Sequence, residues 1–418
     1  MGGNVMKKYV STMLAVTLFA SMTVGCSQSQ KEPEEKFQNI HLTIASDIAP
    51  EDVLVEQITK FQKLYADKVN LNYTIKNQEE DDIVKAPRKA SDIFNIANDQ
   101  VDELYRSGTL LEITENQENV ISSVGGETST AAQTVMRDGK LYGYPLSSGN
   151  GYFLYYNKAY LSEDDISSLD NILSVAAQNG KKFTMDFSSG WYLFSFFKGA
   201  GLNLDYQEDK AANLCNWNAT NTEHTGVAVT QAMLNITGND GFLNLPNGDF
   251  VEYASNDDVI AGVSGQWHAE ELAQAWGDNY AAAKLPTYTL DGEQVQMASF
   301  TGYRIVGVNA YSENPVWAMR LAEYLSNEET QLKCFETIGQ CPANLRAAGS
   351  EEVKASPAVA ATAEQAPYAY IQHVADPFWD ASSQFGTTIA EGNPGNEDLQ
   401  KLLDKMVGKI IIPVNTNQ

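Results

Sequence analysis

The chain has 418 residues, of which 43% are hydrophobic and 20% are charged. This length predicts two or three lobes with buried cores, and the composition excludes a disordered tail, a collagen-like fibre and a polytopic membrane protein. Asp and Glu outnumber Lys and Arg by 54 to 28, and the resulting net charge of −26 argues against nucleic acid as a partner.

The N-terminus has the pattern of an export signal. Two lysines precede an apolar run at residues 13–20, which is too short for an ordinary transmembrane helix, so we expect residues 1–25 to be removed. The sequence TVGC at residues 23–26 resembles the lipobox of bacterial lipoproteins, with threonine in place of the usual leucine, and implies lipidation of Cys26. An ordinary cleaved signal is the alternative. We favour lipidation because residues 26–38 then form a polar tether, which places the protein outside the cytoplasm, anchored to the cell membrane.

The cysteines and histidines show no pattern that binds metal. If Cys26 is lipidated, Cys215, Cys334 and Cys341 remain, so at most one disulfide can form, and whether Cys334 pairs with Cys341 stays open. The four histidines are scattered. P-loop, dinucleotide-binding, G-x-S-x-G and HExxH motifs are absent, so we expect no metal, no cofactor and no catalytic residue.

Strands and helices alternate along the first part of the chain. Residues 40–46 predict a buried strand, and a helix follows from Pro50. Residues 69–75 alternate as a second strand, and residues 93–96 form a third apolar run. Asp99 then suits the start of another helix. This alternation predicts an α/β fold with a mostly parallel sheet.

The same alternation continues beyond residue 140, and a second lobe is expected to start near residue 146. The expected elements are a strand-rich stretch at 143–157, a helix to about 178, a strand at 182–187, a helix around 227–236, a segment at 261–267, strands near 283 and 305, a helix from Pro315 and two helical patterns in the tail.

Eight blocks, in order, resemble the extracellular solute-binding proteins of carbohydrate ABC importers, close to the maltose and maltodextrin branch. They lie at residues 91–113, 138–145, 155–158, 263–267, 283–287, 302–310, 318–326 and 376–379. The resemblance implies a two-lobe α/β clamp of the periplasmic-binding-protein type, whose chain crosses the hinge several times. It also implies that ligand is held between the lobes and that the closed protein docks on membrane permease subunits. We expect a monomer.

The lobe boundaries follow from the same blocks. The first lobe is expected to comprise residues 39–146 and 284–325, and the second residues 147–283 and 326–418.

A sugar ring has apolar faces and a rim of hydroxyl groups, so its binder needs flat aromatic side chains together with amide and carboxylate groups. Of six tryptophans, Trp191, Trp267 and Trp379 match positions at which members of the resembled family stack on sugars. The alternative for each of them is packing in the core. The spacing of Trp276 and Trp317 favours the core, and Trp217 is assigned there too.

Polar candidates for the rim lie where strands meet helices or where the chain crosses between lobes. They are Asp47, Asn98, Asp99, Asn150, Tyr152 and Tyr303. Each of these residues also has a structural alternative. Asp99 could serve simply as a helix cap and Tyr303 as a core residue, and Asn150 and Tyr152 could simply belong to a hinge loop.

We therefore hypothesise a lipid-anchored binding protein, not an enzyme, that captures maltodextrin-type oligosaccharides for an ABC importer. One alternative is a protein of the same fold that binds another glycan. The other is a surface glycoside hydrolase, which needs two carboxylates at a set separation.

Overall fold

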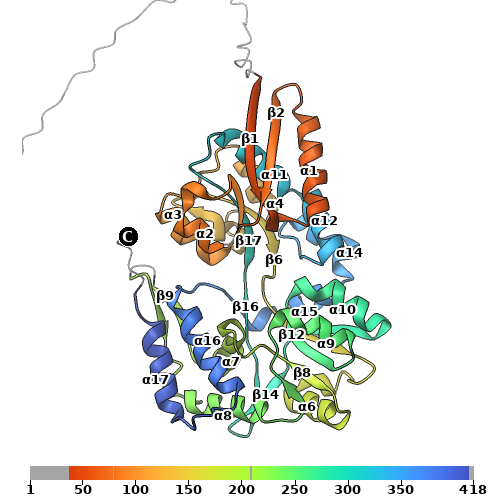
Figure 1. The fold of residues 1–418 in the computed structure, drawn as a ribbon, viewed down its shortest axis with the longest axis vertical. Coiled ribbons are helices and arrows are strands. Elements are labelled where there is room, and N and C mark those ends of the chain that lie inside the picture. Colours follow the sequence, from red (N-terminus) through yellow and green to blue (C-terminus); the bar gives the residue numbers. More distant parts are fainter. Residues whose placement is uncertain (1–36, 79, 208–209, 414–418) are drawn as a thin grey trace, which may run out of the picture.

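The computed structural model describes residues 37–413 except 79 and 208–209, and within this part the chain forms two lobes, one above the other in Figure 1. The predicted export signal and Cys26 lie outside the described residues. No helix in the described part is both long and apolar enough to cross a membrane.

The first lobe, at the top of Figure 1, contains a sheet in the order β2-β1-β3-β17-β6. Its strands are β1 (Gln38–Ala45), β2 (Val69–Lys76), β3 (Ile93–Ala97), β6 (Tyr144–Ser148) and β17 (Tyr303–Val308). The N-terminal strands run parallel, as predicted, whereas β17 runs antiparallel to both β3 and β6. Its helices are α1 (Glu51–Leu64), α2 (Glu80–Lys85), α3 (Val101–Arg106), α4 (Gln117–Ser123), α5 (Thr130–Val135), α11 (Pro315–Leu325) and α12 (Glu328–Ile338), with the short hairpin β4 (Met136–Arg137) and β5 (Lys140–Leu141).

The second lobe contains a sheet in the order β11-β8-β12-β7-β13. Its strands are β7 (Phe153–Asn157), β8 (Lys182–Thr184), β11 (Phe242–Leu243), β12 (Val259–Ser264) and β13 (Tyr280–Ala283). Along β7, Leu154 and Tyr156 enter one core and Phe153 and Tyr155 another, so the sheet is buried on both faces. Its helices are α6 (Leu169–Gln178), α7 (Gly190–Gly199), α8 (Gly226–Thr237), α9 (Phe250–Ser255), α10 (Ala269–Trp276), α15 (Pro357–Gln365), α16 (Pro377–Ala390) and α17 (Leu399–Ile410).

Shorter elements complete the two lobes and the connections between them. They are β9 (Leu204–Gln207), β10 (Ala212–Cys215), β14 (Thr287–Leu290), β15 (Glu293–Gln296), β16 (Ser299–Thr301), β18 (Ala369–Ile371), α13 (Leu345–Ala348), α14 (Glu351–Lys354) and the 3₁₀ turns at Ser46–Ile48, Asn98–Gln100, Asn247–Asp249 and Gln266–His268.

The three tryptophans assigned to the core are buried. Trp217 is fully buried and stacks on Phe197 with ring centroids 4.3 Å apart and planes 4° apart. Trp317 lies in the core of the first lobe, and Trp276 is buried in the second lobe beside Phe250. These predictions are confirmed.

The chain crosses between the two sheets several times. It passes from β6 to β7 through residues 149–152, returns from β16 to β17 at Gly302, and passes from α12 to α15 through residues 339–356. These crossings form the hinge that the α/β clamp architecture requires.

Two segments pack differently from the lobe boundaries expected from the sequence. Leu285, Tyr288 and Met297 belong to the core of the second lobe, although residues 284–325 were assigned to the first. In α12, Cys334 belongs to the core of the first lobe, although residues 326–418 were assigned to the second. Hydrophobic periodicity shows that a face is buried but does not show against which sheet, and this explains both differences.

The two sheets present corresponding edges to each other. In the first lobe, β1 and β3 end where β17 begins, since Arg304 pairs with Ala97. In the second lobe, β12 ends where β7 begins, since Ser264 pairs with Phe153. Because β7 and β17 both start directly after a crossing, the carboxyl ends of β1, β3, β8 and β12 all face the seam between the lobes. In open α/β sheets this is the edge at which ligands bind.

Candidate functional site

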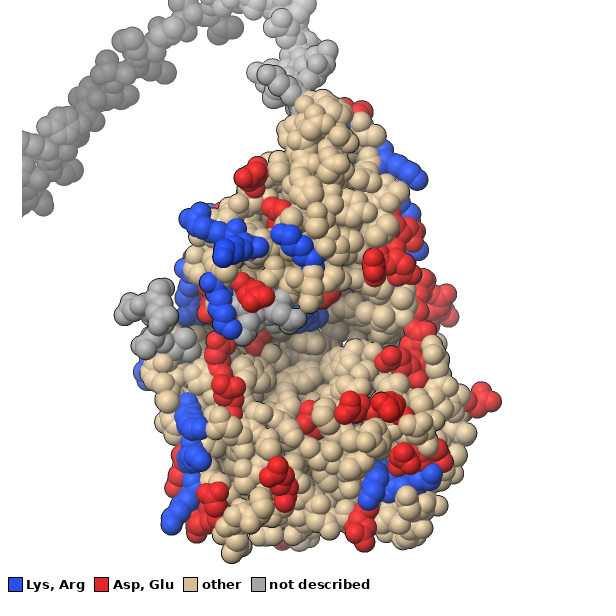
Figure 2. All heavy atoms as spheres, in the orientation of Figure 1, with Lys and Arg blue, Asp and Glu red and all other residues tan. Residues whose placement is uncertain are grey.

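The molecular surface is hollowed between the two lobes (Figure 2). Most of the residues that the sequence marked as candidates are carried by segments that adjoin this seam. Asp47, Asn98 and Asp99 follow β1 and β3 in the first lobe, whereas Trp191 and Trp267 follow β8 and β12 in the second. Asn150 and Tyr152 belong to the first crossing.

Trp191 and Trp267 form an aromatic pair on the second lobe. Their rings stack with centroids 5.6 Å apart and planes 27° apart. Trp267 keeps 38% of its surface exposed, and its Nε1 donates to Oδ1 of Asn247 at 3.0 Å. An exposed tryptophan held in one orientation is a ready platform for the apolar face of a ring-shaped ligand.

The indole N–H of Trp191 is buried and has no hydrogen-bond partner among the described residues. A buried donor without a partner costs about 1 to 3 kcal/mol. The indole N–H groups of Trp217 and Trp276, both in the core, have no partner in the described part of the chain either, so this feature does not distinguish Trp191 from a core tryptophan.

Tyr152 supports Trp191 and does not itself reach the seam. Its side chain is 1% exposed, its ring meets Trp191 edge-on at 4.9 Å, and its hydroxyl donates to the backbone oxygen of Trp191 at 2.7 Å and accepts from Ser195. Tyr152 was expected to bind ligand hydroxyl groups, but in the structure its side chain is buried and its only O–H donates to Trp191, so it supports that residue. Burial also raises the pKa of Tyr152, so the group stays neutral.

Trp379 lies in the first turn of α16, partly buried, with its ring edge-on to Phe378. The N-terminus of α7 packs tightly on α16, since a side chain at Gly190 would overlap Ser382. The helix starts that carry Trp191 and Trp379 are thus held together at one side of the second lobe.

Asn98 joins three segments through its side-chain amide. Its side chain is 7% exposed, its amide nitrogen donates to the backbone oxygen of Gln372 at 2.9 Å, and its oxygen accepts from the backbone nitrogen of Tyr303 at 2.9 Å. Gly302 leaves the room that this oxygen needs. Asn98 was expected to contact ligand, and in the structure it fastens β3, the second crossing and residue 372 together.

Two carboxylates of the first lobe lie close to these segments. Oδ2 of Asp99 accepts from Nε2 of Gln372 at 2.6 Å. Asp47 is exposed and lies 3.4 Å from the guanidinium of Arg304, which also donates to Asn95. Both acids therefore retain the position predicted for them, but each already has a protein partner.

The remaining two candidates are half-buried at the crossings. Tyr303 packs against the core of the first lobe, and burial raises its pKa. The backbone nitrogen of Asn150 donates to the oxygen of Gly302, which ties the first crossing to the second.

Sequence reasoning missed Asp186, which follows β8 four residues before α7. The predicted strand ran to residue 187, whereas β8 ends at Thr184 and leaves Asp186 in a loop beside the start of α7. Burial raises its pKa, while the backbone N–H groups of Ser188 and Asn247 oppose that shift. The sequence did contain a signal for Asp186, because it is an acidic residue that follows a buried parallel strand.

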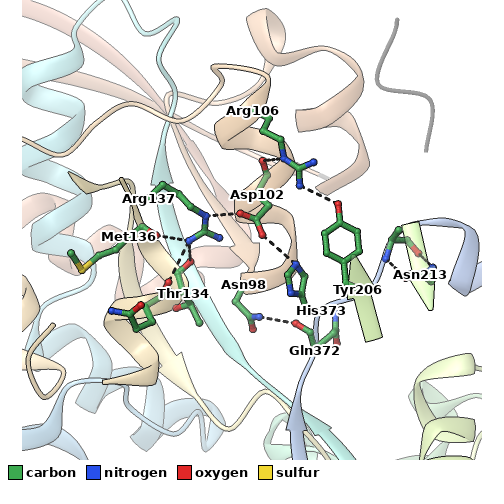
Figure 3. A network of polar contacts seen from close by, with 12 residues as sticks. Asn98, Asp102, Arg106, Thr134, Met136, Arg137, Tyr206, Asn213, Gln372 and His373 are labelled. Carbon is green, nitrogen blue, oxygen red and sulfur yellow. Dashed lines mark hydrogen bonds and ion pairs between the residues drawn. The ribbon is translucent and has the colours of Figure 1, made fainter. Parts of the chain in front are cut away.

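A polar network across the lobes was also missed (Figure 3). Asp102 of α3 lies 3.2 Å from Nε2 of His373 in the second lobe and also pairs with Arg137. Arg106 donates to the hydroxyl of Tyr206 on β9 at 3.1 Å, and the ring of Tyr206 lies 4.5 Å from that of His373. No sequence pattern links residues so far apart, so only the fold reveals this contact.

The carboxylate at the centre of the network is strongly perturbed. Burial alone would raise the pKa of Asp102, but hydrogen bonds from His373 and Arg137 outweigh it and lower the pKa to about 2. Asp102 is therefore ionised at neutral pH and links the two lobes.

No group of acidic, histidine or cysteine side chains in the described ranges could hold a metal ion. Cys215, Cys334 and Cys341 are all free thiols. The arrangement as a whole offers aromatic planes, amides and carboxylates at a seam between two lobes, which suits reversible binding of a polyhydroxylated molecule.

Comparison with known proteins identifies the family. Residues 56–361 match the family model described as bacterial extracellular solute-binding protein. The galactooligosaccharide-binding protein of Bacillus subtilis (strain 168) is 25% identical over 378 residues, which cover 87% of this chain and 86% of that protein.

Solved structures agree with the fold. One, solved with acarbose, is 26% identical with a TM-score of 0.77 and covers 89% of this chain and 98% of its own. The maltodextrin-binding protein MalE1 from L. casei BL23, solved without ligand, is 22% identical with a TM-score of 0.72. The match covers 89% of this chain and 99% of MalE1. The resemblance found in the sequence is thereby confirmed, and so are the two-lobe α/β architecture and the assignment as a binding protein that is not an enzyme. The chain belongs to the bacterial extracellular solute-binding proteins.

Proposed function

We propose that this protein is the lipid-anchored binding component of an ABC importer, which captures maltodextrin-type oligosaccharides between its lobes and delivers them unchanged to the permease. The observation that carries the proposal is the Trp191–Trp267 pair at the carboxyl edge of the second sheet. The resemblance of the sequence to the maltodextrin branch, the acarbose bound in one solved neighbour and the name of the maltodextrin-binding protein MalE1 support the choice of sugar.

The free energy of binding at micromolar affinity requires several aromatic side chains that stack on the sugar. Covering one face of a sugar ring removes roughly 40 to 50 Å² of apolar surface from water, about 1 kcal/mol at the usual coefficient, while micromolar affinity needs about 8 kcal/mol. Trp379 is proposed as the third platform, and Asp47, Asp99 and Asn150 as polar contacts that become available when the lobes move.

Ligand drives closure when it contacts both lobes only in the closed state, because its differential affinity then shifts the equilibrium between open and closed forms. Asp102 and Arg106 of the first lobe also contact His373 and Tyr206 of the second lobe directly.

A second ligand class has its own support. The relative from Bacillus subtilis is named for galactooligosaccharides, whose rings also have apolar faces and a rim of hydroxyls. The same aromatic pair would serve such a ligand, so the choice between the two classes depends on the placement of polar groups.

Isothermal titration calorimetry with a panel of glycans separates these proposals. We expect maltotriose and longer maltooligosaccharides to bind, and xylo- and galactooligosaccharides to bind at least tenfold more weakly. Tight binding of galactooligosaccharides with no response to any α-1,4-glucan would overturn the choice of sugar. Chromatography of the same mixtures after long incubation should show no shorter products, and their release would establish a hydrolase.

The lipid anchor requires a separate test. We expect the wild-type protein to partition into the membrane fraction of cells and a Cys26→Ser variant to lose this partition. Equal release of both proteins into the medium would show that Cys26 is not modified.

A further inference from the structure

The indole of Trp267 occupies the space in which a side chain at position 265 would begin. A Cβ built on Gly265 would lie well under 3.0 Å from Cζ3, Cη2 and Cε3 of the six-membered ring. The backbone of Gly265 has φ −98° and ψ −172°, an extended conformation that any residue adopts. Glycine is therefore required at this position for room and not for backbone freedom.

The other parts of the Trp267 side chain are held from different directions. Its Nε1 donates to Oδ1 of Asn247, and Trp191 stacks on its ring. Asn247 is itself fixed, because its Nδ2 donates to the backbone oxygen of Val263 at 3.2 Å and its Oδ1 accepts from Ser264 at 3.2 Å.

The backbone below the ring is also restrained. The oxygen of Gly265 accepts from the buried hydroxyl of Tyr155 at 3.0 Å, so a larger residue at position 265 cannot make room for itself without breaking that bond. A substitution there must consequently move the indole.

We propose that Gly265 and Asn247 are positioning residues that set the orientation of Trp267 as a platform for the sugar ring. The inference rests on the proposed function, because it concerns how the same site holds its oligosaccharide. Neither residue needs to touch the ligand, and each acts through Trp267.

A double-mutant cycle measured by calorimetry with maltotetraose tests the proposal. In the wild-type background we expect Gly265→Ala and Asn247→Ala each to weaken binding about 5- to 30-fold. In a Trp267→Ala background the same substitutions should change the affinity less than about twofold, since the group through which they act is gone. A merely structural role would weaken binding equally in both backgrounds.

Gly248→Ala is the matched control, because its added Cβ would meet open space and the residue lies next to Asn247. It should leave the affinity unchanged. If Gly265→Ala fails to fold, Asn247→Ala alone decides the outcome. Equal losses in the two backgrounds, or no loss in either, would overturn the inference while wild-type binding still stands. Absence of binding by the wild-type protein to every glycan in the panel would instead refute the proposed function, and the inference would fall with it.

Discussion

Replacing Asn98 by alanine should destabilise the protein. The side chain is 7% exposed and satisfies two backbone groups, the oxygen of Gln372 and the nitrogen of Tyr303. Alanine leaves both groups in the interior without their partner, at a cost of about 1 to 3 kcal/mol each. We therefore expect Asn98→Ala to lower the free energy of unfolding by about 2 to 6 kcal/mol.

Urea denaturation followed by circular dichroism measures this change, with calorimetry on the same preparation to measure sugar affinity. Asn39→Ala is the control, because Asn39 lies on the surface of β1 and its side chain bonds only to that of Asn70 among the contacts described. We expect that control to change stability by less than about 0.5 kcal/mol. An Asn98→Ala protein of unchanged stability that binds sugar at least tenfold more weakly would refute the structural role and restore Asn98 as a ligand residue.

Three further predictions concern the core, the platforms and the charged groups. Trp217→Ala should lower the free energy of unfolding by about 3 to 5 kcal/mol, whereas Trp379→Ala should mainly weaken sugar binding, by about 1 to 3 kcal/mol in calorimetry; the reverse pattern would exchange their roles. Burial lowers the pKa of His268 from 6.5 to about 4, so between these values the unfolded chain binds a proton that the folded protein excludes. Stability should therefore fall as the pH drops through this window, by about 1 to 3 kcal/mol, and His268→Gln should lack this part of the slope in urea titrations. Asp102→Asn removes the charge that links α3 to His373, so small-angle scattering should show a larger radius of gyration for the ligand-free protein; an unchanged radius would contradict a holding role.

The sequence predicted the architecture well because its signals are local. Alternation of strands and helices, and acids placed after buried strands, depend on short stretches of chain. Local patterns and the family resemblance also assigned Trp217, Trp276 and Trp317 to the core and Trp267 to the ligand site. The burial of the first three confirms their assignment to the core.

What the sequence could not show is which partner each polar group would find. Asn98 and Tyr152 have the chemistry of ligand contacts, but Gln372, Tyr303 and Trp191 take up their hydrogen bonds. These partners lie 39 to 274 positions away along the chain.

The lobe boundaries were missed for a related reason. The hairpin of β14 and β15 and the helix α12 each carry a clear apolar face, but which sheet covers that face depends on the path of the crossings. The polar network between the lobes likewise exists only once two separately folded units meet.

A crystal structure of the complex with maltotetraose tests the central claim most directly. We expect glucose rings in the seam between the lobes, lying against Trp191, Trp267 and Trp379. Sugar bound outside that seam, or an empty seam at saturating maltotetraose, would contradict the account.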